Sequence, residues 1–414
     1  MSKPLPPDLA QGETQHDPEE FQSLPGWLYH DPEFFAYEAE RVFRASWQVV
    51  CHVNDIPNAG DYVTFDYLGE SIVVLRGDDG AVRAFHNVCR HRAARLLDGP
   101  AGHCRFRLSC PYHGWSYDLR GRLAGVPFRE TFVDLDMAAH GLKPVEHEIY
   151  HAFIFIRLGG SGPSVAEMMS PYEAEIAAYR MEEMVPLGRV TLRSRAVNWK
   201  TISDNYSDSL HINVAHPGLT RLFGKGYGIE AREWVHKMWG RLRDEPSSNR
   251  SERMYQRYLP RVAHLPEDRQ RLWVYFKLWP NVAFDIYPDQ IDFMQFVPVS
   301  ATSTMIREIA YVHPDARREM KTARYLNWRI NRQVNKEDTD LINRVQAGMA
   351  SSSYQAGPLG TTEVCLRQFA RKLRALAPMA RERRAPAPGW SRSAQITAPD
   401  APPAEPQARR SQSQ

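Results

Sequence analysis

The sequence predicts an α+β fold with two domains, and three observations lead to this prediction. Short β-branched and aromatic runs alternate with glycine turns between residues 61 and 87, which is typical of an antiparallel meander. Four later apolar runs are predicted strands, at 272–279, 282–287, 291–299 and 304–312. A long helix is predicted at 316–347, closed by Gly348. Strands followed by a long helix are typical of an α+β domain, and 414 residues suffice for two cores.

Both ends of the chain are predicted to be disordered. Residues 1–25 are rich in Pro, Gln, Asp and Glu, and residues 381–414 repeat Pro, Ala, Ser and Arg. That basic tail holds six Arg against three acidic residues, which accounts for the whole net charge of +3. The remaining body is close to neutral, which argues against a nucleic-acid partner. No stretch approaches the ~20 apolar residues that span a bilayer, so we expect a cytoplasmic protein without membrane contact.

The ordered part of the chain is predicted to begin with a helix within residues 26–46, which packs on the larger domain. Asp31 is a capping residue followed by Pro32, and a predicted buried face follows, formed by Phe35, Ala39, Val42 and Phe43. We place a small β domain at 47–160. The larger domain is placed at 161–380, and it should begin with a helical stretch at 172–184.

The small domain carries two short runs, Cys89-Arg90-His91 and Cys110-Pro111-Tyr112-His113, separated by eighteen residues. A Rieske [2Fe-2S] cluster takes two thiolates on one iron and two neutral imidazoles on the other. Zinc also takes two Cys and two His, but zinc sites usually pair the cysteines in one loop and the histidines in another. Here each loop supplies one of each. The ligands Cys89, His91, Cys110 and His113 therefore predict a Rieske cluster and a role in electron transfer.

The sequence around both runs, at 85–92 and 110–117, resembles the Rieske domain of the ring-hydroxylating oxygenases. That family usually has fifteen to seventeen residues between the first His and the second Cys, and a turn at 98–102 is able to absorb the extra residue here. Tyr112 and Trp115 stand where high-potential Rieske proteins carry an additional Cys and a Ser that donates to cluster sulfur. With fewer such hydrogen bonds, we expect a reduction potential near the low end of the Rieske range, about −150 mV.

A second group of metal-binding residue types lies at Asp208, His211 and His216. Asp208 and His211 are three residues apart and should share one helix face. His216 precedes Pro217, where the helix should unwind and let His216 turn in beside His211. An iron(II) that activates oxygen takes two His and one carboxylate and keeps other positions free. The two histidines are therefore predicted iron ligands, and the carboxylate must come from elsewhere in the chain.

The predicted carboxylate ligand is Asp338, with its neighbours Glu337 and Asp340 as rivals. The pattern Glu-Asp-x-x-Leu, followed by Gln346 and Gly348, resembles the C-terminal part of the large subunits of Rieske non-heme iron oxygenases. In that family the Asp of Glu-Asp binds the iron. The resemblance therefore implies this role for Asp338.

The resemblance spans residues 26–380 and implies an architecture. A Rieske β domain would be inserted in a helix-grip catalytic domain, in which a curved antiparallel sheet wraps round a long helix above a buried iron. The chain would form a head-to-tail homotrimer, with or without a small second subunit, and the cluster of one subunit would face the iron of the next. In the family an acidic residue three positions before the first iron His bridges the two metal sites, and here that residue is Asp208.

The implied function is that of a terminal oxygenase, either a mono- or a dioxygenase. Electrons from NAD(P)H would reach the cluster through a separate reductase, with or without a ferredoxin, and the iron would use O2 to hydroxylate a small organic substrate. The glycine-rich runs at 159–160 and 224–228 lack the Gly-x-Gly-x-x-Gly spacing of a nucleotide site, so a separate reductase is needed. A pure Rieske electron carrier would not need the second domain. A helix-grip ligand carrier would leave both metal motifs unexplained.

The substrate pocket is predicted to have aromatic walls. The candidate lining residues are Leu219, Phe223, Trp273, Phe276, Phe284 and Phe293. Such walls accept a planar ring by stacking, and equally a quaternary ammonium group by cation–π contacts. Enzymes acting on betaine-like or carnitine-like compounds often carry Glu at the bridging position. Asp208 therefore favours an aromatic substrate, with hydroxylation or demethylation of a quaternary ammonium compound as the alternative.

Overall fold

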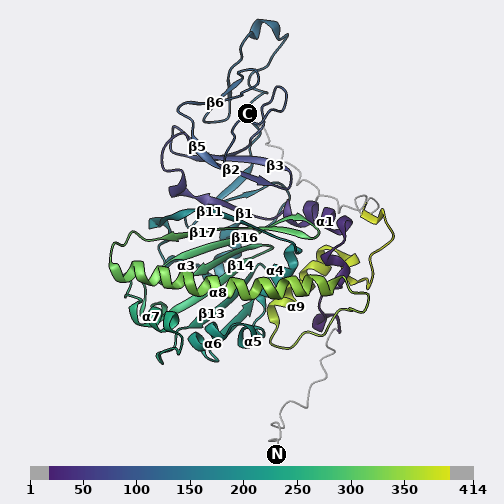
Figure 1. The fold of residues 1–414 in the computed structure, drawn as a ribbon. Coiled ribbons are helices and arrows are strands. Elements are labelled where there is room, and N and C mark those ends of the chain that lie inside the picture. Colours follow the sequence, from purple (N-terminus) through teal and green to yellow (C-terminus); the bar gives the residue numbers. More distant parts are fainter. Residues whose placement is uncertain (1–17, 392–414) are drawn as a thin grey trace, which may run out of the picture.

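The structure, a computed structural model, describes residues 18–391 (Figure 1). Its larger domain is built on a seven-stranded antiparallel sheet in the order β11-β17-β16-β15-β14-β13-β12. The strands are β11 Val185–Arg195, β12 Tyr227–Ala231, β13 Val235–Arg241, β14 Leu272–Leu278, β15 Val282–Ile286, β16 Ile291–Ser300 and β17 Ser303–Val312. Helix α8, Arg318–Met349, crosses one face of this sheet (Figure 1). The predicted helix-grip domain is confirmed, although α8 continues through Gly348 rather than ending before it.

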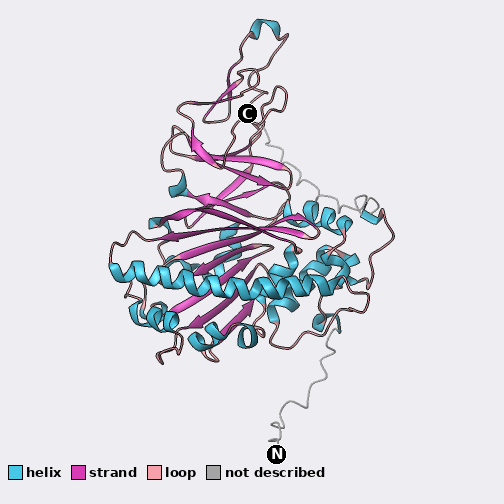
Figure 2. Ribbon diagram, in the orientation of Figure 1, coloured by secondary structure: helices cyan, strands magenta, loops and turns pink. Residues whose placement is uncertain are grey.

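The smaller domain projects from the larger one and consists of one four-stranded sheet, β4-β3-β2-β5, and two three-stranded sheets, β1-β10-β9 and β6-β7-β8 (Figure 2). The strands are β1 Gln48–His52, β2 Asp61–Tyr67, β3 Glu70–Arg76, β4 Val82–His86, β5 Ala101–His103, β6 Arg107–Ser109, β7 Ser116–Asp118, β8 Leu123–Gly125, β9 Glu146–Tyr150 and β10 Phe153–Arg157. The antiparallel meander predicted at 61–87 is confirmed as β2, β3 and β4.

Shorter helices complete the fold. They are α1 Pro32–Glu38, α2 Val165–Met169, α3 Glu173–Ala177, α4 Trp199–Ser207, α5 Ile212–Ala215, α6 Pro217–Phe223, α7 Arg250–Tyr258 and α9 Val364–Leu376. The helical stretch predicted at 172–184 is broken after α3, because Arg180 adopts a left-handed conformation with φ of 46° that an α-helix cannot contain. Between residues 18 and 391, none of the helices has the length and apolarity that crossing a membrane requires.

The N-terminal helix packs on the larger domain, and its predicted buried face is confirmed in part: Val42 and Phe43 are buried, whereas Phe35 and Ala39 are only partly buried. Asp31 caps α1 by accepting the backbone N–H of Phe34. The chain then passes through one π-helical turn at 39–43, and the buried residues of α1 are Phe34 and Glu38. Glu38 is fully buried because it pairs with the equally buried Lys200 of α4, with 2.8 Å between Oε1 and Nζ. A pattern of apolar residues cannot reveal a charged side chain that faces the core.

Part of each end that was predicted to be disordered is packed in the structure. The guanidinium of Arg374 donates to the backbone carbonyls of Gln22 and Ser23, and Leu24 is buried. At the other end, the indole of Trp27 donates to the carbonyl of Glu382 at 2.7 Å. These contacts join the two ends of the chain, and local composition carries no information about such pairing. The predictions for 1–17 and 392–414 lie outside the described residues.

Candidate metal centres and pocket

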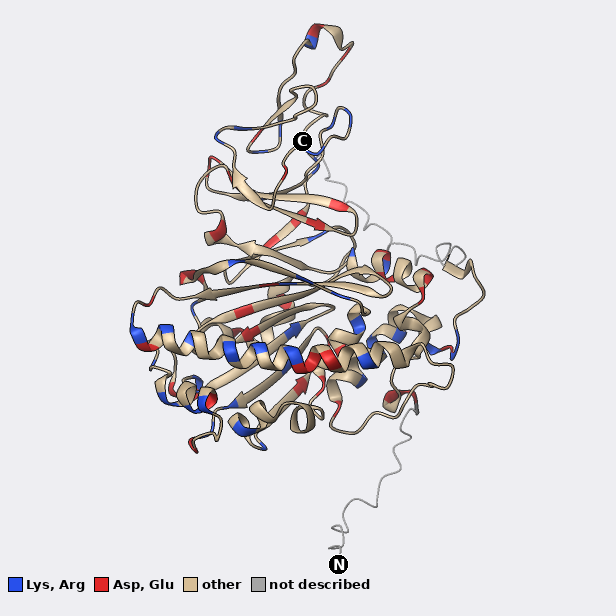
Figure 3. Cartoon of the chain, viewed as in Figure 1, with Lys and Arg blue, Asp and Glu red and all other residues tan. Residues whose placement is uncertain are grey.

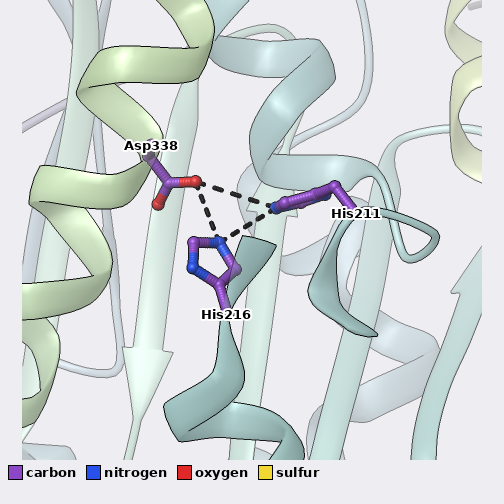
Figure 4. A group of neighbouring side chains, drawn as sticks. All are labelled: His211, His216 and Asp338. Atoms are coloured by element: carbon purple, nitrogen blue, oxygen red, sulfur yellow. Dashed lines mark hydrogen bonds and ion pairs between the residues drawn. The ribbon is translucent and has the colours of Figure 1, made fainter. Parts of the chain in front are cut away.

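The three predicted iron ligands converge between α8 and the segment that follows α4 (Figure 4). The Nε2 atoms of His211 and His216 lie 3.1 Å apart. Oδ1 of Asp338 lies 3.0 Å from Nε2 of His216 and 3.7 Å from Nε2 of His211. Within the described chain, no other set of three His, Cys, Asp or Glu residues brings its ligand atoms within 4.8 Å of one another. Two imidazoles and one carboxylate are the donor set of an oxygen-activating iron(II).

The backbone that positions the histidines is not the continuous helix that we predicted. Asp208 follows the last residue of α4 and is extended, with φ of −85° and ψ of 135°. Its carboxylate accepts the backbone N–H groups of Leu210 and His211, and such local bonding competes with helical hydrogen bonds. Helix α5 then spans only 212–215. His211 and His216 therefore stand at the two ends of a single helical turn, and their rings converge.

A further carboxylate orients each histidine. Nδ1 of His211 donates to Oδ2 of Asp208 at 2.9 Å, and Nδ1 of His216 donates to Oε2 of Glu337 at 2.8 Å. Because both Nδ1 atoms donate, both Nε2 atoms keep a lone pair for a metal. Burial lowers the pKa of His216, but hydrogen bonds and charge attraction from Asp338 and Glu337 outweigh burial and raise it. The surroundings thus favour positive charge at this point, which fits a bound cation.

Acidic residues are grouped in the second half of α8, whereas the other charged residues of this helix are mostly basic (Figure 3). They include Asp338 and its two rivals. Glu337 faces the outer nitrogen of His216 and not the point of convergence, whereas Asp340 is exposed. The helix therefore presents Asp338 alone of the three to both Nε2 atoms.

The four predicted cluster ligands lie in the smaller domain, where the two cysteines are close together and the two histidines are close together. The thiols of Cys89 and Cys110 are buried and adjacent, and the rings of His91 and His113 lie 4.7 Å apart. Nδ1 of His91 is buried and has no hydrogen-bond partner. Buried polar atoms without partners are rare in folded proteins. A two-iron cluster, which takes thiols on one side and imidazoles on the other, fits both the pairing and the open nitrogen.

One residue beside the cluster ligands, Tyr117, was not predicted from the sequence to have a role. The hydroxyl of Tyr117 accepts the backbone N–H of Arg90 at 2.9 Å and lies 3.4 Å from Sγ of Cys89, so its own hydrogen is available to sulfur. Hydrogen bonds to ligand sulfur raise the potential of such clusters. Tyr117 should therefore raise the reduction potential of the cluster above the low value that we predicted. The ring of Trp115 stacks on that of His91 at 4.9 Å and fixes its orientation.

A cavity of about 100 Å³ opens beside the candidate iron ligands. Only one predicted lining residue, Leu219, borders it, and the other five do not: Phe223, Trp273, Phe276, Phe284 and Phe293. Side chains alternate along a strand, so Tyr275 faces the cavity while its neighbour Phe276 joins the core on the opposite face of the sheet. The charged and aromatic lining residues from α4, from the sheet and from the residue that follows β15 are Tyr206, Tyr227, Tyr275, Asp285, Tyr287, Asp292 and Glu308.

Both domains of the chain match known protein families. Residues 175–378 match the family described as the ring hydroxylating alpha subunit (catalytic domain), and residues 46–140 match the Rieske [2Fe-2S] domain. The chain is 31% identical over 359 residues to the carnitine monooxygenase oxygenase subunit of Escherichia coli (strain K12), which covers 85% of this chain and 91% of that protein. It is 38% identical over 199 residues to the glycine betaine monooxygenase oxygenase subunit of Chromohalobacter salexigens, which covers 48% of this chain and 44% of that protein.

The fold is also shared with solved structures. A quaternary ammonium Rieske monooxygenase matches with a TM-score of 0.73 at 24% identity, over 88% of this chain and 99% of that chain. This likeness concerns the fold, whereas the E. coli relative is similar enough in sequence and coverage to show the family. The cofactors of that family are a Rieske cluster and a mononuclear iron, which work with O2 and a partner reductase. The chain therefore belongs to the Rieske non-heme iron oxygenases, as a large (alpha) subunit that catalyses the terminal oxygenation.

Proposed function

We propose that this oxygenase acts as a monooxygenase that hydroxylates or demethylates a quaternary ammonium compound. From the sequence we expected an aromatic substrate, with a quaternary ammonium compound as the alternative. Asp208 alone favoured the aromatic substrate, and the predicted pocket residues included no charged side chain. The relatives named above act on carnitine and glycine betaine, which supports the alternative over the aromatic prediction.

The lining of the metal cavity is the observation that carries the proposal. The rings of Tyr227 and Tyr275 lie 6.4 Å apart, and those of Tyr275 and Tyr287 lie 6.2 Å apart at 87°. Tyrosine faces attract ammonium groups, and several together form a cage for a methylated nitrogen. Asp285 and Asp292 border the same cavity. A neutral aromatic ring would desolvate these carboxylates without pairing them, whereas a cation compensates their charge.

We propose the predicted ligands for both centres. His211, His216 and Asp338 would hold the mononuclear iron, and the two Cys and two His of the smaller domain would hold the cluster. When bound, the iron supplies oxygen activation and the cluster supplies electrons. The residues around the iron position have separate tasks: Asp208 and Glu337 keep the imidazoles in one tautomer, and the tyrosines and carboxylates hold the substrate's ammonium group beside the metal.

The proposed assembly is a head-to-tail trimer. Large apolar side chains are exposed in the cluster domain, at Phe106, Tyr112 and Phe128, and also next to the iron histidines, at Leu210 and Val214. Exposed apolar side chains on two different parts of one chain fit a heterologous contact that closes into a ring. In such a ring the partly exposed carboxylate beside His211 would reach the partner subunit's His113. Light scattering of the purified protein should give the mass of three chains, and a monomer would contradict the proposed ring.

Oxygen uptake with a surrogate reductase tests the substrate proposal. We expect compounds that carry a trimethylammonium group to raise oxygen uptake and to be consumed in proportion to it. Planar aromatic compounds of similar size should raise uptake little and give no product. Coupled oxidation of an aromatic compound, with trimethylammonium compounds inert, would contradict the proposal.

A further inference from the structure

We infer that the metal cavity selects quaternary ammonium compounds whose negative charge, where they carry one, lies several carbon atoms from the ammonium group. The inference rests on the proposed function and extends it to the shape of the substrate. It follows from a division of the active-site space into an acidic inner cavity, beside the candidate iron ligands, and a basic outer chamber.

Two facing carboxylates define the inner cavity. Asp285 of β15 pairs directly with Asp292 of β16, and side chains in such positions lie about 5 Å apart. Tyr206 and Tyr287 donate hydrogen bonds to Asp285, and the amide of Gln290 donates to Asp292 at 2.8 Å. None of these donors carries charge. Within residues 18–391 neither carboxylate takes part in an ion pair, so any negative charge on the pair lacks a positive partner until a cation binds.

The electrostatics of this pair agree with a cation site. Burial, together with the nearby charge of Glu308, raises the pKa of Asp285 to about 7. Burial and the charge of Asp285 raise the pKa of Asp292 well above its usual range. Both causes disfavour the ionised forms in the empty cavity. A bound ammonium group would reverse them, because it supplies the missing positive charge between the two strands.

The outer chamber is larger and has the opposite character. Its volume is about 810 Å³, and it shares Asp292, Glu308, Asn331 and Asn335 with the inner cavity. Five basic residues line it, which we call the basic rim: Arg189, Arg193, Lys321, Arg324 and Arg332. The outer chamber therefore adds positive charge to the active-site space, whereas the charged residues of the inner cavity, apart from the histidines, are acidic.

Arg193 and Gln290, which line this chamber, each have one buried side-chain atom without a hydrogen-bond partner. The guanidinium of Arg193 pairs with Glu308, which borders both spaces, while its Nε is buried without a partner. Gln290 is 5% exposed, and its Oε1 has no partner because its amide group is turned toward Asp292. Both atoms are shielded from the chamber, so the exposed part of the Arg193 guanidinium is what this wall offers to a ligand.

The two compartments discriminate between substrates by charge spacing. A carboxylate one methylene away from the ammonium group would lie beside Asp285 and Asp292, where like charges repel in a partly desolvated space. A carboxylate at the end of a three-methylene chain would extend toward the basic rim. Choline carries no carboxylate and so avoids the repulsion without gaining contact with the rim.

Calorimetric binding to the metal-loaded, oxidised enzyme tests this inference without a need for turnover. We expect 4-(trimethylammonio)butanoate to bind most tightly, choline less tightly, and glycine betaine at least ten-fold more weakly than the butanoate. Glycine betaine binding as tightly as the butanoate would overturn the inference while leaving the proposed function in place. If no trimethylammonium compound binds and an aromatic compound does, the proposed function itself is wrong and the inference falls with it.

Substitutions in the basic rim separate its contribution to substrate affinity from that of Asp285 and Asp292. Arg189→Gln should weaken the butanoate at least five-fold and leave choline unchanged, and since Arg189 forms no ion pair in the described chain, this variant should fold normally. Arg318→Gln is the matched control, because Arg318 is exposed on α8 outside the chamber. Equal weakening of choline and butanoate binding by Arg189→Gln, or no weakening, would overturn the inference.

Asp292→Asn tests the inner pair. This variant should reduce the difference in affinity between the butanoate and glycine betaine, because one of the two repelling carboxylates is removed. An unchanged difference in affinity would also overturn the inference.

Discussion

Asp208 and His211 are joined twice, since the carboxylate of Asp208 accepts both the backbone N–H and the ring Nδ1–H of His211. Burial raises the pKa of Asp208, but the hydrogen bonds from His211 and from the backbone of Leu210 outweigh burial and lower it. The carboxylate is therefore a charged acceptor fixed against a candidate iron ligand. It is well placed to connect that ligand to a second imidazole across a subunit contact.

Replacement of Asp208 tests this connection. Asp208→Asn should leave both metal centres occupied and the assembly intact, because Asn keeps the size of the side chain. It offers one acceptor atom in place of two, so electron transfer from the cluster to the iron site should slow by orders of magnitude. Stopped-flow measurement of cluster reoxidation, with substrate and oxygen present, reads this rate. Asp340→Asn is the control, and a rate in Asp208→Asn within a few-fold of this control would remove Asp208 from the electron path.

Substitutions on α8 test the carboxylate ligand. Asp338→Ala should lose the mononuclear iron and all hydroxylation, while the Rieske spectrum survives, because the two metal sites are built from separate domains. Metal analysis should fall from three irons and two sulfides per chain to two irons and two sulfides. Asp340→Ala should keep all three irons. The reverse pattern, with iron lost only from Asp340→Ala, would show that the ligand is wrongly assigned.

Tyr117 gives a prediction about the cluster potential. Tyr117→Phe removes a hydroxyl 3.4 Å from Sγ of Cys89 and keeps the ring that fills the core. The reduction potential should fall, because a hydrogen bond to ligand sulfur stabilises the reduced, more negative cluster. A redox titration followed by EPR measures it. Tyr112→Phe, at an exposed tyrosine, serves as the control, and equal potentials in the two variants would show that Tyr117 does not donate to sulfur.

The buried pair of Glu38 and Lys200 gives a prediction about stability. Lys200→Met leaves the Glu38 carboxylate buried without its partner, which should cost about 3–5 kcal/mol of unfolding free energy. The double variant Glu38→Gln/Lys200→Met should recover much of that loss, because no charge remains in the core. Urea unfolding of both variants measures the difference. A double variant no more stable than Lys200→Met would show that packing, not charge, explains the loss.

The metal motifs could be read from the sequence because their ligands sit at short, fixed spacings. Asp338 was found only through the resemblance, since a lone acidic residue on a helix has no local signature. The predicted pocket lining was wrong for a physical reason. We chose Phe276, Phe284 and Phe293 because they are hydrophobic, but these side chains point into the core on the far face of the sheet. The residues of these strands that do line the cavity include acidic residues, which alternate with the phenylalanines along the chain. In a strand sequence alone, acidic residues at alternate positions predict a solvent-exposed face, whereas here α8 covers that face.

The strand β11 was also missed, because most of its side chains are exposed and the strand lacks the apolar run by which the others were recognised. Residues 18–25 were missed for a different reason: their order comes from contacts with α9, far along the chain. In both cases tertiary structure decides what the local sequence leaves open.

A single-turnover experiment tests the central claim most directly. Enzyme with a fully reduced cluster is mixed with oxygen and a trimethylammonium substrate, without any reductase, and product is quantified per chain. We expect the cluster to become oxidised as hydroxylated or demethylated product forms, and to remain reduced far longer when substrate is omitted. Oxidation of the cluster at the same rate with and without substrate, and with no product, would contradict the claim that this chain is an oxygenase for quaternary ammonium compounds.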